Sequence, residues 1–454
     1  MTDPVAAVGL HDGVTISAEG PAVLMRTPAS REAEEARFCD KALRRMNHPG
    51  SISPPEARRL IALAVLLAIA IGLPTVAWSR AAEPSPQTRA THDTLTPVLQ
   101  RVLSPPRWYH ADDGRFHLEY ELRLTNAVSV PTSVTSLEVL RAGGHRVTTL
   151  SGGGLEGAMS LLGTPDQPTT ELPPATVGIV WVDLSFAHRR QVPRRIEHRL
   201  AIDVGPGYPV GPSITDTGGK ATVASKPARE IGPPLRGGRW VAIIGAHRRA
   251  LQPVNGALRN GQRFAVDWSA RLDDAGRTHV GDPNQNQSYF NYGQPVLAVS
   301  AGKVVEAVDG FPDQVPNNPG PPSVEAADGN HVILKLGKGV FAGYAHLVPG
   351  SVRVHRRDRV REGQVLGKLG NSGNSSGPHL HFQLMNQPSL LDADGLPFVL
   401  DRFTLRGRAT SLEALIDADA APPPVPPVPI DRSVHGRFRD RGLADLDVVT
   451  LPNG

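Results

Sequence analysis

The sequence contains a single cysteine, Cys39, and no cysteine follows it. Intramolecular disulfides and cysteine-ligated metals are therefore excluded from the rest of the chain. A metal bound there must be held by histidine, aspartate or glutamate. The net charge is only +4, and no concentrated basic stripe is present, so the sequence does not favour a nucleic-acid partner.

Length and composition indicate more than one folded domain. With 454 residues the chain is too long for one ordinary domain. Hydrophobic residues make up 40% and charged residues 20%, which is typical of globular proteins. The 46 glycines and 43 prolines favour strands, turns and loops over long helices. These numbers predict a mainly β protein, and they specify no oligomeric state.

One uncharged hydrophobic stretch, "LIALAVLLAIAIGLPTVAW" at residues 60–78, follows Arg58 and Arg59. Such a stretch is either the apolar core of a signal peptide or a single membrane anchor. Small residues follow it, with a candidate cleavage site after Ala81. We therefore expect export to the periplasm or cell envelope, and the sequence leaves both cleavage and anchoring open.

The region before this stretch is long for a signal peptide. It is either an N-terminal tail or a misassigned start, because starting at Met46 would leave a short basic leader. The predicted organisation is as follows: tail or misassigned start 1–58, signal peptide or membrane anchor 59–81, linker 82–100, β-sandwich 101–205, linker 206–232, second domain 233–403, and a Pro-rich, mostly disordered tail 404–454.

Strand patterns dominate the region assigned to the sandwich. The segments "RFHLEYELRLTN", "TSVTSLEVLRAGG", "TVGIVWVDLSF" and "RIEHRLAIDV" alternate apolar and polar residues and are bounded by Gly, Pro, Asn or Asp. No helical periodicity separates them. Repeated strands at this spacing predict an immunoglobulin-like β-sandwich, which we interpret as a spacer or docking module.

The second domain is also rich in strand patterns, and the chain beyond it is rich in proline. "PVLAVSAGKVVEAV", "NHVILKLGKGVFAGYAHL" and "HLHFQLM" are typical strand segments. The later segment "APPPVPPVP" is a polyproline stretch, which does not fit a helix or strand. We therefore expect the last fifty residues to be mostly disordered.

Two histidines stand on alternate positions in "GNSGNSSGPHLHFQL", just where a strand is expected to begin. Side chains at positions i and i+2 of a strand point to the same face. His379 and His381 are therefore expected to converge on one point, with Leu380 facing the core. Two converging imidazoles suggest a metal, or a metal ligand beside a proton-transfer group. Two surface histidines on a half-buried strand are the alternative.

Two further polar residues interrupt apolar runs of the same domain. Asp267 lies in "FAVDW" and His346 lies in "GYAHL". A carboxylate in apolar surroundings is costly unless it is paired or bound to a cation. One acid and three histidines at strand positions predict a zinc hydrolase site, in which one coordination position stays open for water.

Three longer segments carry a family resemblance. "YGQPVLAVSAGKVVEA", "GYAHL" and "VREGQVLGKLGNSGNSSGPHLHFQL" resemble, in order and spacing, the lysostaphin-type zinc endopeptidases that cut peptide cross-bridges of bacterial cell walls. The resemblance covers residues 262–385. It implies an antiparallel β-barrel-like domain with a groove over Zn²⁺ and peptidoglycan peptides as the substrate. It implies zinc ligation by Asp267 and His381, and catalytic roles for His346 and His379.

One position departs from the family pattern. Four residues before Asp267, where the family places a histidine ligand, this chain has Arg263, and a guanidinium cannot donate a lone pair to zinc. A hairpin turning near residues 255–256 would bring His247 next to Arg263, so His247 is the first candidate for the third ligand. His279 or Asp282, in an insertion after Asp267, is the second. Absence of catalytic zinc is the third alternative.

The sequence is compatible with two functions. The first is an exported zinc metallopeptidase that hydrolyses peptide bonds of cell-wall peptidoglycan, which the "GYAHL" and "HLH" segments favour. The second is a catalytically inactive module of the same fold that binds the cell wall or regulates another hydrolase, which Arg263 favours.

Overall fold

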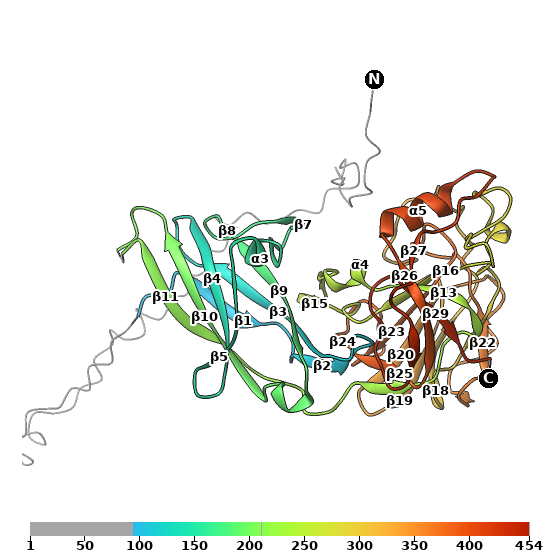
Figure 1. Ribbon diagram of the computed structural model, residues 1–454, viewed down its shortest axis with the longest axis horizontal. Helices are drawn as coiled ribbons and strands as arrows, with labels where there is room; N and C mark the ends of the chain where they lie inside the picture. The colour runs from blue at the N-terminus through green and yellow to red at the C-terminus, as the bar shows by residue number, and fades with distance from the viewer. Residues whose placement is uncertain (1–93, 210, 454) are drawn as a thin grey trace, which may run out of the picture. The chain divides into compact units, whose positions relative to one another are not determined.

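The computed structural model describes residues 94–209 and 211–453, which form many strands and a few short helices (Figure 1). The prediction of a mainly β fold with antiparallel sheets is confirmed. Among the described residues, no helix has the length and apolar character needed to cross a membrane. The hydrophobic stretch at residues 60–78, with the cleavage site after Ala81, lies outside the described residues.

Two sheets pack around one core between residues 98 and 223, which we call the sandwich half. The first sheet contains β1 (Val98–Val102), β2 (Arg107–His110), β3 (Phe116–Asn126), β6 (Met159–Leu161), β7 (Thr164–Pro168) and β9 (Val177–Phe186). The second contains β4 (Thr132–Arg141), β5 (His145–Ser151), β8 (Glu171–Leu172), β10 (Arg195–Val204) and β11 (Ser213–Thr222). Short turns of helix, α3 (Gly152–Glu156) and η1 (Arg189–Gln191), connect the strands.

The alternating sequence pattern of these strands places their apolar residues in the core. Leu118 and Leu122 of β3 share one core with Leu137 of β4 and Leu200 of β10, and all four are fully buried. Burial of each such side chain contributes roughly 1.5–3 kcal/mol. The period of two therefore specifies which face of each sheet is inside.

The predicted linker at residues 206–232 is wrong over much of its length. Residues 213–222 form β11, which pairs antiparallel with β10 from Asp203↔Ser213 to Arg195↔Thr222. The segment "SITDTGGKAT" is largely polar and half exposed, so its own sequence gives little strand signal. Backbone pairing with a neighbouring strand, which is not local information, makes it an edge strand.

A second core lies between residues 231 and 451, which we call the C-terminal half. Its main sheet has twelve strands and is open, not closed into a barrel. The strands are β13 (Gly237–Ile243), β16 (Val266–Arg271), β18 (Gly302–Val308), β19 (Asn330–Gly337), β20 (Val340–Leu347), β21 (Arg359–Val360), β23 (Leu380–Met385), β24 (Gly395–Leu396), β26 (Phe403–Ala409), β27 (Ile430–Asp431), β28 (Gly436–Phe438) and β29 (Asp447–Leu451).

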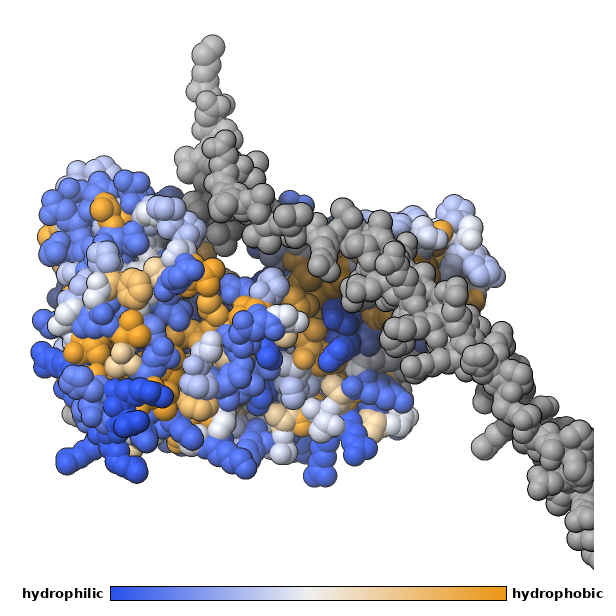
Figure 2. All heavy atoms as spheres, turned by 180° about the vertical axis from the view of Figure 1, so that it is seen from behind, coloured by the Kyte–Doolittle hydropathy of each residue, from blue (hydrophilic) through white to orange (hydrophobic). Residues whose placement is uncertain are grey.

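Smaller elements surround this sheet. Three strand pairs are β12 (Arg229–Ile231) with β25 (Phe398–Leu400), β14 (Gln252–Val254) with β15 (Ala257–Arg259), and β17 (Pro295–Leu297) with β22 (Val365–Lys368). The short helices are α4 (Gly245–Arg248), η2 (Asn286–Ser288) and α5 (Leu412–Ala420). On the face shown in Figure 2, apolar side chains are interspersed among hydrophilic ones.

The prediction of a mostly disordered tail at residues 404–454 is also wrong. β29 lies between β13 and β26 inside the main sheet, and Val449 and Leu451 belong to its core. The proline-rich segment is held as well, because Val425 and Val428 between the prolines are buried, and the Val428 N–H donates to the Gly276 carbonyl. The proline-rich composition favoured disorder, because composition does not show the distant strands and core that hold this segment in place.

Replacing Leu405 by alanine is expected to destabilise the protein by about 2–5 kcal/mol, because Leu405 is 3% exposed and packs in the core of the C-terminal half. The neighbouring Arg406 is exposed, so Arg406→Ala is expected to change stability by roughly 0.5 kcal/mol or less. Chemical denaturation of both variants measures the difference. Equal stability of the two variants would contradict a packed C-terminal segment.

Candidate metal centre

The candidate site lies on four neighbouring strands of the main sheet, in the order β20, β23, β16, β13. A single row of paired residues crosses them. Ala345 of β20 pairs with His381 of β23, His381 pairs with Asp267 of β16, and Asp267 pairs with Ile243 of β13. Directly opposed residues on antiparallel strands have their side chains side by side. The sheet register therefore places Asp267 against His381.

His379 and His381 converge on the Asp267 carboxylate, as the two-residue period of a strand predicts. His381 Nδ1 lies 2.9 Å from Asp267 Oδ1. His379 Nε2 lies 3.7 Å from the same oxygen. Leu380, between them, is fully buried in the core.

His247 completes the group from outside the strands. It lies in α4, the turn that follows β13, and its Nε2 is 2.9 Å from Asp267 Oδ2. One potential ligand atom from each of His247, Asp267 and His381 lies within 4.8 Å of the others, so the three side chains could hold a metal ion. The structure thus brings together three of the residues expected at the site.

The expected hairpin is present, but its strand pairing does not include His247. Its strands β14 and β15 pair from Gln252↔Arg259 to Val254↔Ala257, with Asn255 and Gly256 at the turn. Asn255 and Gly256 both have positive φ, 49° and 76°, as a tight two-residue turn requires. The strand pairing ends at Gln252, however, and the turn of α4 carries His247 to Asp267.

The other candidates for the third ligand lie elsewhere, and those expectations are wrong. His279 is fully buried, with Nε2 3.1 Å from the Ala421 carbonyl oxygen and its ring stacked on Tyr289. Asp282 accepts the Asn284 N–H, 2.9 Å away, and serves its own loop. The insertion packs against the segment after α5, a contact that sequence separation conceals, and so it does not reach Asp267.

Two glutamines, which sequence reasoning missed, orient the imidazoles. His247 Nδ1 lies 2.9 Å from Gln262 Oε1, and His381 Nε2 lies 2.9 Å from Gln383 Oε1. An amide oxygen only accepts, so each outer nitrogen carries the proton and donates it. The inner nitrogens are thereby directed at Asp267. Outer hydrogen bonds of this kind fix the tautomer of metal-ligating histidines.

Two further observations indicate that these side chains could bind a cation. His247 Nε2 is buried and has no hydrogen-bond partner, although Asp267 is in contact with it. Burial opposes ionisation of Asp267, but the neighbouring histidines, His247 first among them, hold the pKa of that carboxyl well below its usual range. Burial likewise lowers the pKa of His247, yet Asp267 outweighs this effect and the net pKa is raised. A carboxylate and two imidazole nitrogens that converge on one point are a ligand set that suits a divalent metal.

The remaining two histidines lie beside this group and not within it. The His346 and His379 ring centroids are 4.6 Å apart. The Nδ1 of His346 is 2.8 Å from the Ser372 carbonyl oxygen, and that of His379 is 2.9 Å from the Gly377 carbonyl oxygen. The pKa of both histidines is lowered, mainly by burial, so both are neutral near pH 7. Because Nδ1 of each donates to a carbonyl, Nε2 carries no proton.

His346 also has an unusual backbone conformation. Its φ is +63°, in the left-handed region that non-glycine residues rarely adopt. Its N–H donates to the Asp328 carbonyl, and its own carbonyl accepts from Gly370 N–H. Such a conformation costs of order 1–3 kcal/mol and is concentrated at functional sites. The strain supports a functional role for this histidine over a merely structural one.

Comparison with known proteins identifies the class of this domain. Residues 288–393 match the model of Peptidase family M23. This part of the chain is therefore an M23 peptidase domain of the lysostaphin type, as the sequence motifs predicted. The matched segment contains His346, His379 and His381, whereas His247 and Asp267 precede it.

Several relatives share this segment. Glycyl-glycine endopeptidase ALE-1 of Staphylococcus capitis is 39% identical over 98 residues, which are 21% of this chain and 23% of the relative. Lysostaphin of Staphylococcus simulans is 40% identical over 98 residues, 21% of this chain and 17% of the relative. Peptidoglycan DD-endopeptidase ShyA of Vibrio cholerae is 37% identical over 132 residues, 27% of each chain. The chain thus spans about a quarter or less of these relatives.

Solved structures give a similar set. The catalytic domain of lysostaphin from Staphylococcus simulans is 28% identical, and the alignment covers 32% of this chain and 80% of that domain with a TM-score of 0.20. A zinc-containing peptidase from Vibrio cholerae is 15% identical, and the alignment covers 61% of this chain and 81% of that chain with a TM-score of 0.22.

Proposed function

We propose that this protein is an exported zinc metallopeptidase that hydrolyses peptide bonds of cell-wall peptidoglycan. The observation that carries the proposal is the convergence of His247, Asp267 and His381, with the ligand atoms within 4.8 Å of one another. Two imidazole nitrogens and a carboxylate oxygen are ligands that catalytic zinc takes, with a fourth position left for water. The names of the relatives, among them a peptidoglycan endopeptidase, support the substrate class.

His379 and His346 would carry the proton chemistry. Zinc held by His247, Asp267 and His381 would supply an activated water and would polarise the substrate carbonyl. The Nδ1–H of His379 is committed to the Gly377 carbonyl, which leaves Nε2 to accept the proton of the attacking water. After accepting it, the imidazolium can donate to the leaving amine. His346, held in the same way by Ser372, lies beside His379 and also presents an unprotonated Nε2, so it can share in accepting the proton of the water.

Metal analysis combined with digestion of cell-wall sacculi tests the proposal. The purified full chain is expected to bind about one zinc ion and to release soluble muropeptides from sacculi. A chelator is expected to stop the release, and added zinc is expected to restore it. A protein that binds no zinc and leaves sacculi intact with zinc present would refute the hydrolase.

The second candidate, an inactive module of the same fold, is motivated by Arg263. Arg263 does not fill the ligand position, because its side chain is 2% exposed and turns to Glu121 of the sandwich half. The space beside Asp267 is taken by His247 instead. The inactive module predicts binding to sacculi without release of muropeptides, so the same digestion distinguishes the two functions.

A further inference from the structure

Arg263 connects the candidate site to the sandwich half. Its Nε donates to Glu121 Oε1 at 2.6 Å, a second nitrogen contacts Glu121 Oε2, and the same nitrogen donates to Ser104 Oγ at 2.8 Å. Both charged side chains are only 2% exposed. The residue that replaces the family's histidine is thus a buried cation that needs a carboxylate from the other half of the molecule.

The same carboxylate reaches His247 through a short chain of contacts. Glu121 Oε1 accepts from Asn260 Nδ2 at 2.7 Å, and that amide also donates to the Arg248 carbonyl at 3.3 Å. Asn260 and Arg263 are the two ends of the turn that contains Gln262. Because Gln262 Oε1 accepts the Nδ1–H of His247, fixing this turn fixes the imidazole.

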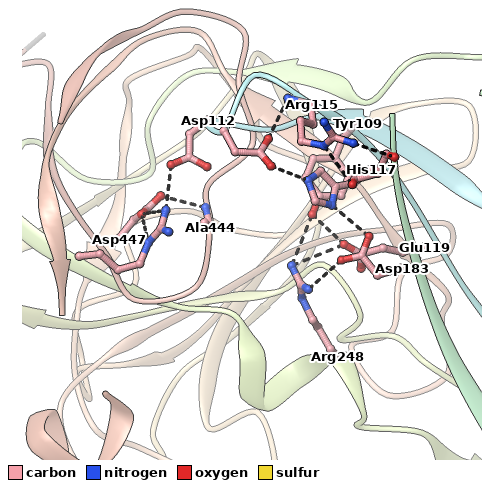
Figure 3. Close-up of polar contacts among 12 residues, drawn as sticks. Tyr109, Asp112, Arg115, His117, Glu119, Asp183, Arg248, Ala444 and Asp447 are labelled. Atoms are coloured by element: carbon pink, nitrogen blue, oxygen red, sulfur yellow. Dashed lines mark hydrogen bonds and ion pairs between the residues drawn. The ribbon is translucent and has the colours of Figure 1, made fainter. Parts of the chain in front are cut away.

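A second set of contacts with the sandwich half supports Arg248, the residue that follows His247. The Arg248 guanidinium lies 3.5 Å from Glu119 Oε1 and 3.3 Å from Asp183 Oδ2, and Tyr109 donates its hydroxyl to Glu119 at 2.7 Å (Figure 3). Glu119 and Asp183 belong to the sandwich half. These carboxylates are paired with cationic side chains, Glu119 with Arg248, and Asp183 with Arg248 and with His117, whose Nδ1 is 3.0 Å away.

Both sets of contacts involve glutamates of one strand, β3. Glu119 and Glu121 are two residues apart on β3, so their side chains share one face of it. Glu119 holds Arg248, which follows His247, and Glu121 holds Arg263, which follows Gln262. Asp267 and His381 are paired strand residues and need no such support. His247 lies on a four-residue turn and depends on what holds that turn.

We propose that β3 of the sandwich half positions His247 as a metal ligand, through Glu121 acting on Arg263 and Asn260, and through Glu119 acting on Arg248. The inference rests on the proposed function, in that zinc is the ion bound. Glu119 and Glu121 are positioning residues that touch neither metal nor substrate. The sandwich is by this reading part of the metal site and not a detachable spacer.

Zinc affinity of the full chain tests the proposal. Removing both charges in Glu121→Leu/Arg263→Met avoids a lone buried charge, and is expected to weaken zinc binding about 10–100-fold in a chelator competition, the range for outer partners of metal ligands. Glu119→Gln is also expected to weaken zinc binding. This single variant tests the proposal if the double variant does not fold. The matched control is Glu138→Gln, which breaks the 2.8 Å pair with Arg199 on the other sheet. The control is expected to bind zinc like the wild type.

A second, metal-free readout separates this inference from the proposed function. The protein is labelled with ¹³C at histidine Cε1, and the His247 signal is assigned with His247→Gln. The signal is expected to shift in the metal-free Glu121→Leu/Arg263→Met and Glu119→Gln variants and to stay in place in Glu138→Gln.

Three outcomes are distinguishable. Weaker zinc binding and a shifted His247 signal in the β3 variants alone support the inference. Wild-type zinc affinity in those variants overturns it and leaves the hydrolase proposal standing. If the wild type binds no zinc, the proposed function fails, and the metal-free signal decides the positioning: an unmoved His247 signal refutes it.

Discussion

Asp267→Ala is expected to abolish zinc binding, with a loss of affinity larger than the about 10–100-fold typical of an outer hydrogen-bond partner. Asp267 contacts all three histidines nearest to it, with oxygens 2.9 Å from His247 Nε2, 2.9 Å from His381 Nδ1 and 3.7 Å from His379 Nε2. Its removal takes away the one anionic ligand and leaves only the two imidazole ligands. Chelator competition measures the affinity, and sacculus digestion is expected to fall to background in parallel.

Asp282→Ala is the matched control for this variant. Asp282 is the other carboxylate that the sequence offered as a ligand, but it accepts the Asn284 N–H within its own exposed loop. Zinc affinity and digestion are expected to be unchanged. Zinc binding by Asp267→Ala at the wild-type affinity would show that this carboxylate does not hold the metal.

His379→Ala is expected to lower the rate of muropeptide release about 10²–10⁴-fold while zinc affinity changes little. The reason is that His379 lies beside the ligand group and presents an unprotonated Nε2, 3.7 Å from Asp267, without being needed to hold the ion. Release of muropeptides measures the rate, and the chelator competition measures the affinity.

His355→Ala controls for loss of a histidine as such, because His355 is 91% exposed and lies outside the site. Its digestion rate is expected to match the wild type. If His379→Ala also digests sacculi at the wild-type rate, His379 has no part in proton transfer. If the wild type binds sacculi but does not digest them, the inactive module is the correct function.

The features that follow from local rules could be predicted from the sequence. The convergence of His379 and His381 follows from the two-residue period of a strand, and Asp267 was singled out because a carboxylate in "FAVDW" needs a partner. Gln383 was missed, although the same period places it on the face of His381, two residues further on. The strand signal was therefore sufficient to find this outer partner.

Other features depend on residues that are distant in the sequence. Glu121 and Arg263 are 142 positions apart, and no local pattern connects them. The composition of residues 404–454 predicts a disordered tail, because the place of β29 between β13 and β26 is set by tertiary contacts. His247 was one of two candidate sources of a third ligand, and the fold chose it by turning α4 back toward Asp267.

The sequence by itself determined the β-rich class, the peptidase motifs and the residue types that surround Asp267. These depend on side-chain alternation and short spacing, which the chain carries at every point along its length. Only the tertiary structure decided that His247 meets the carboxylate, and that Arg263 turns away to Glu121. A buried charge must find its counter-charge in three dimensions, and the strand that supplied it belongs to the other half of the protein.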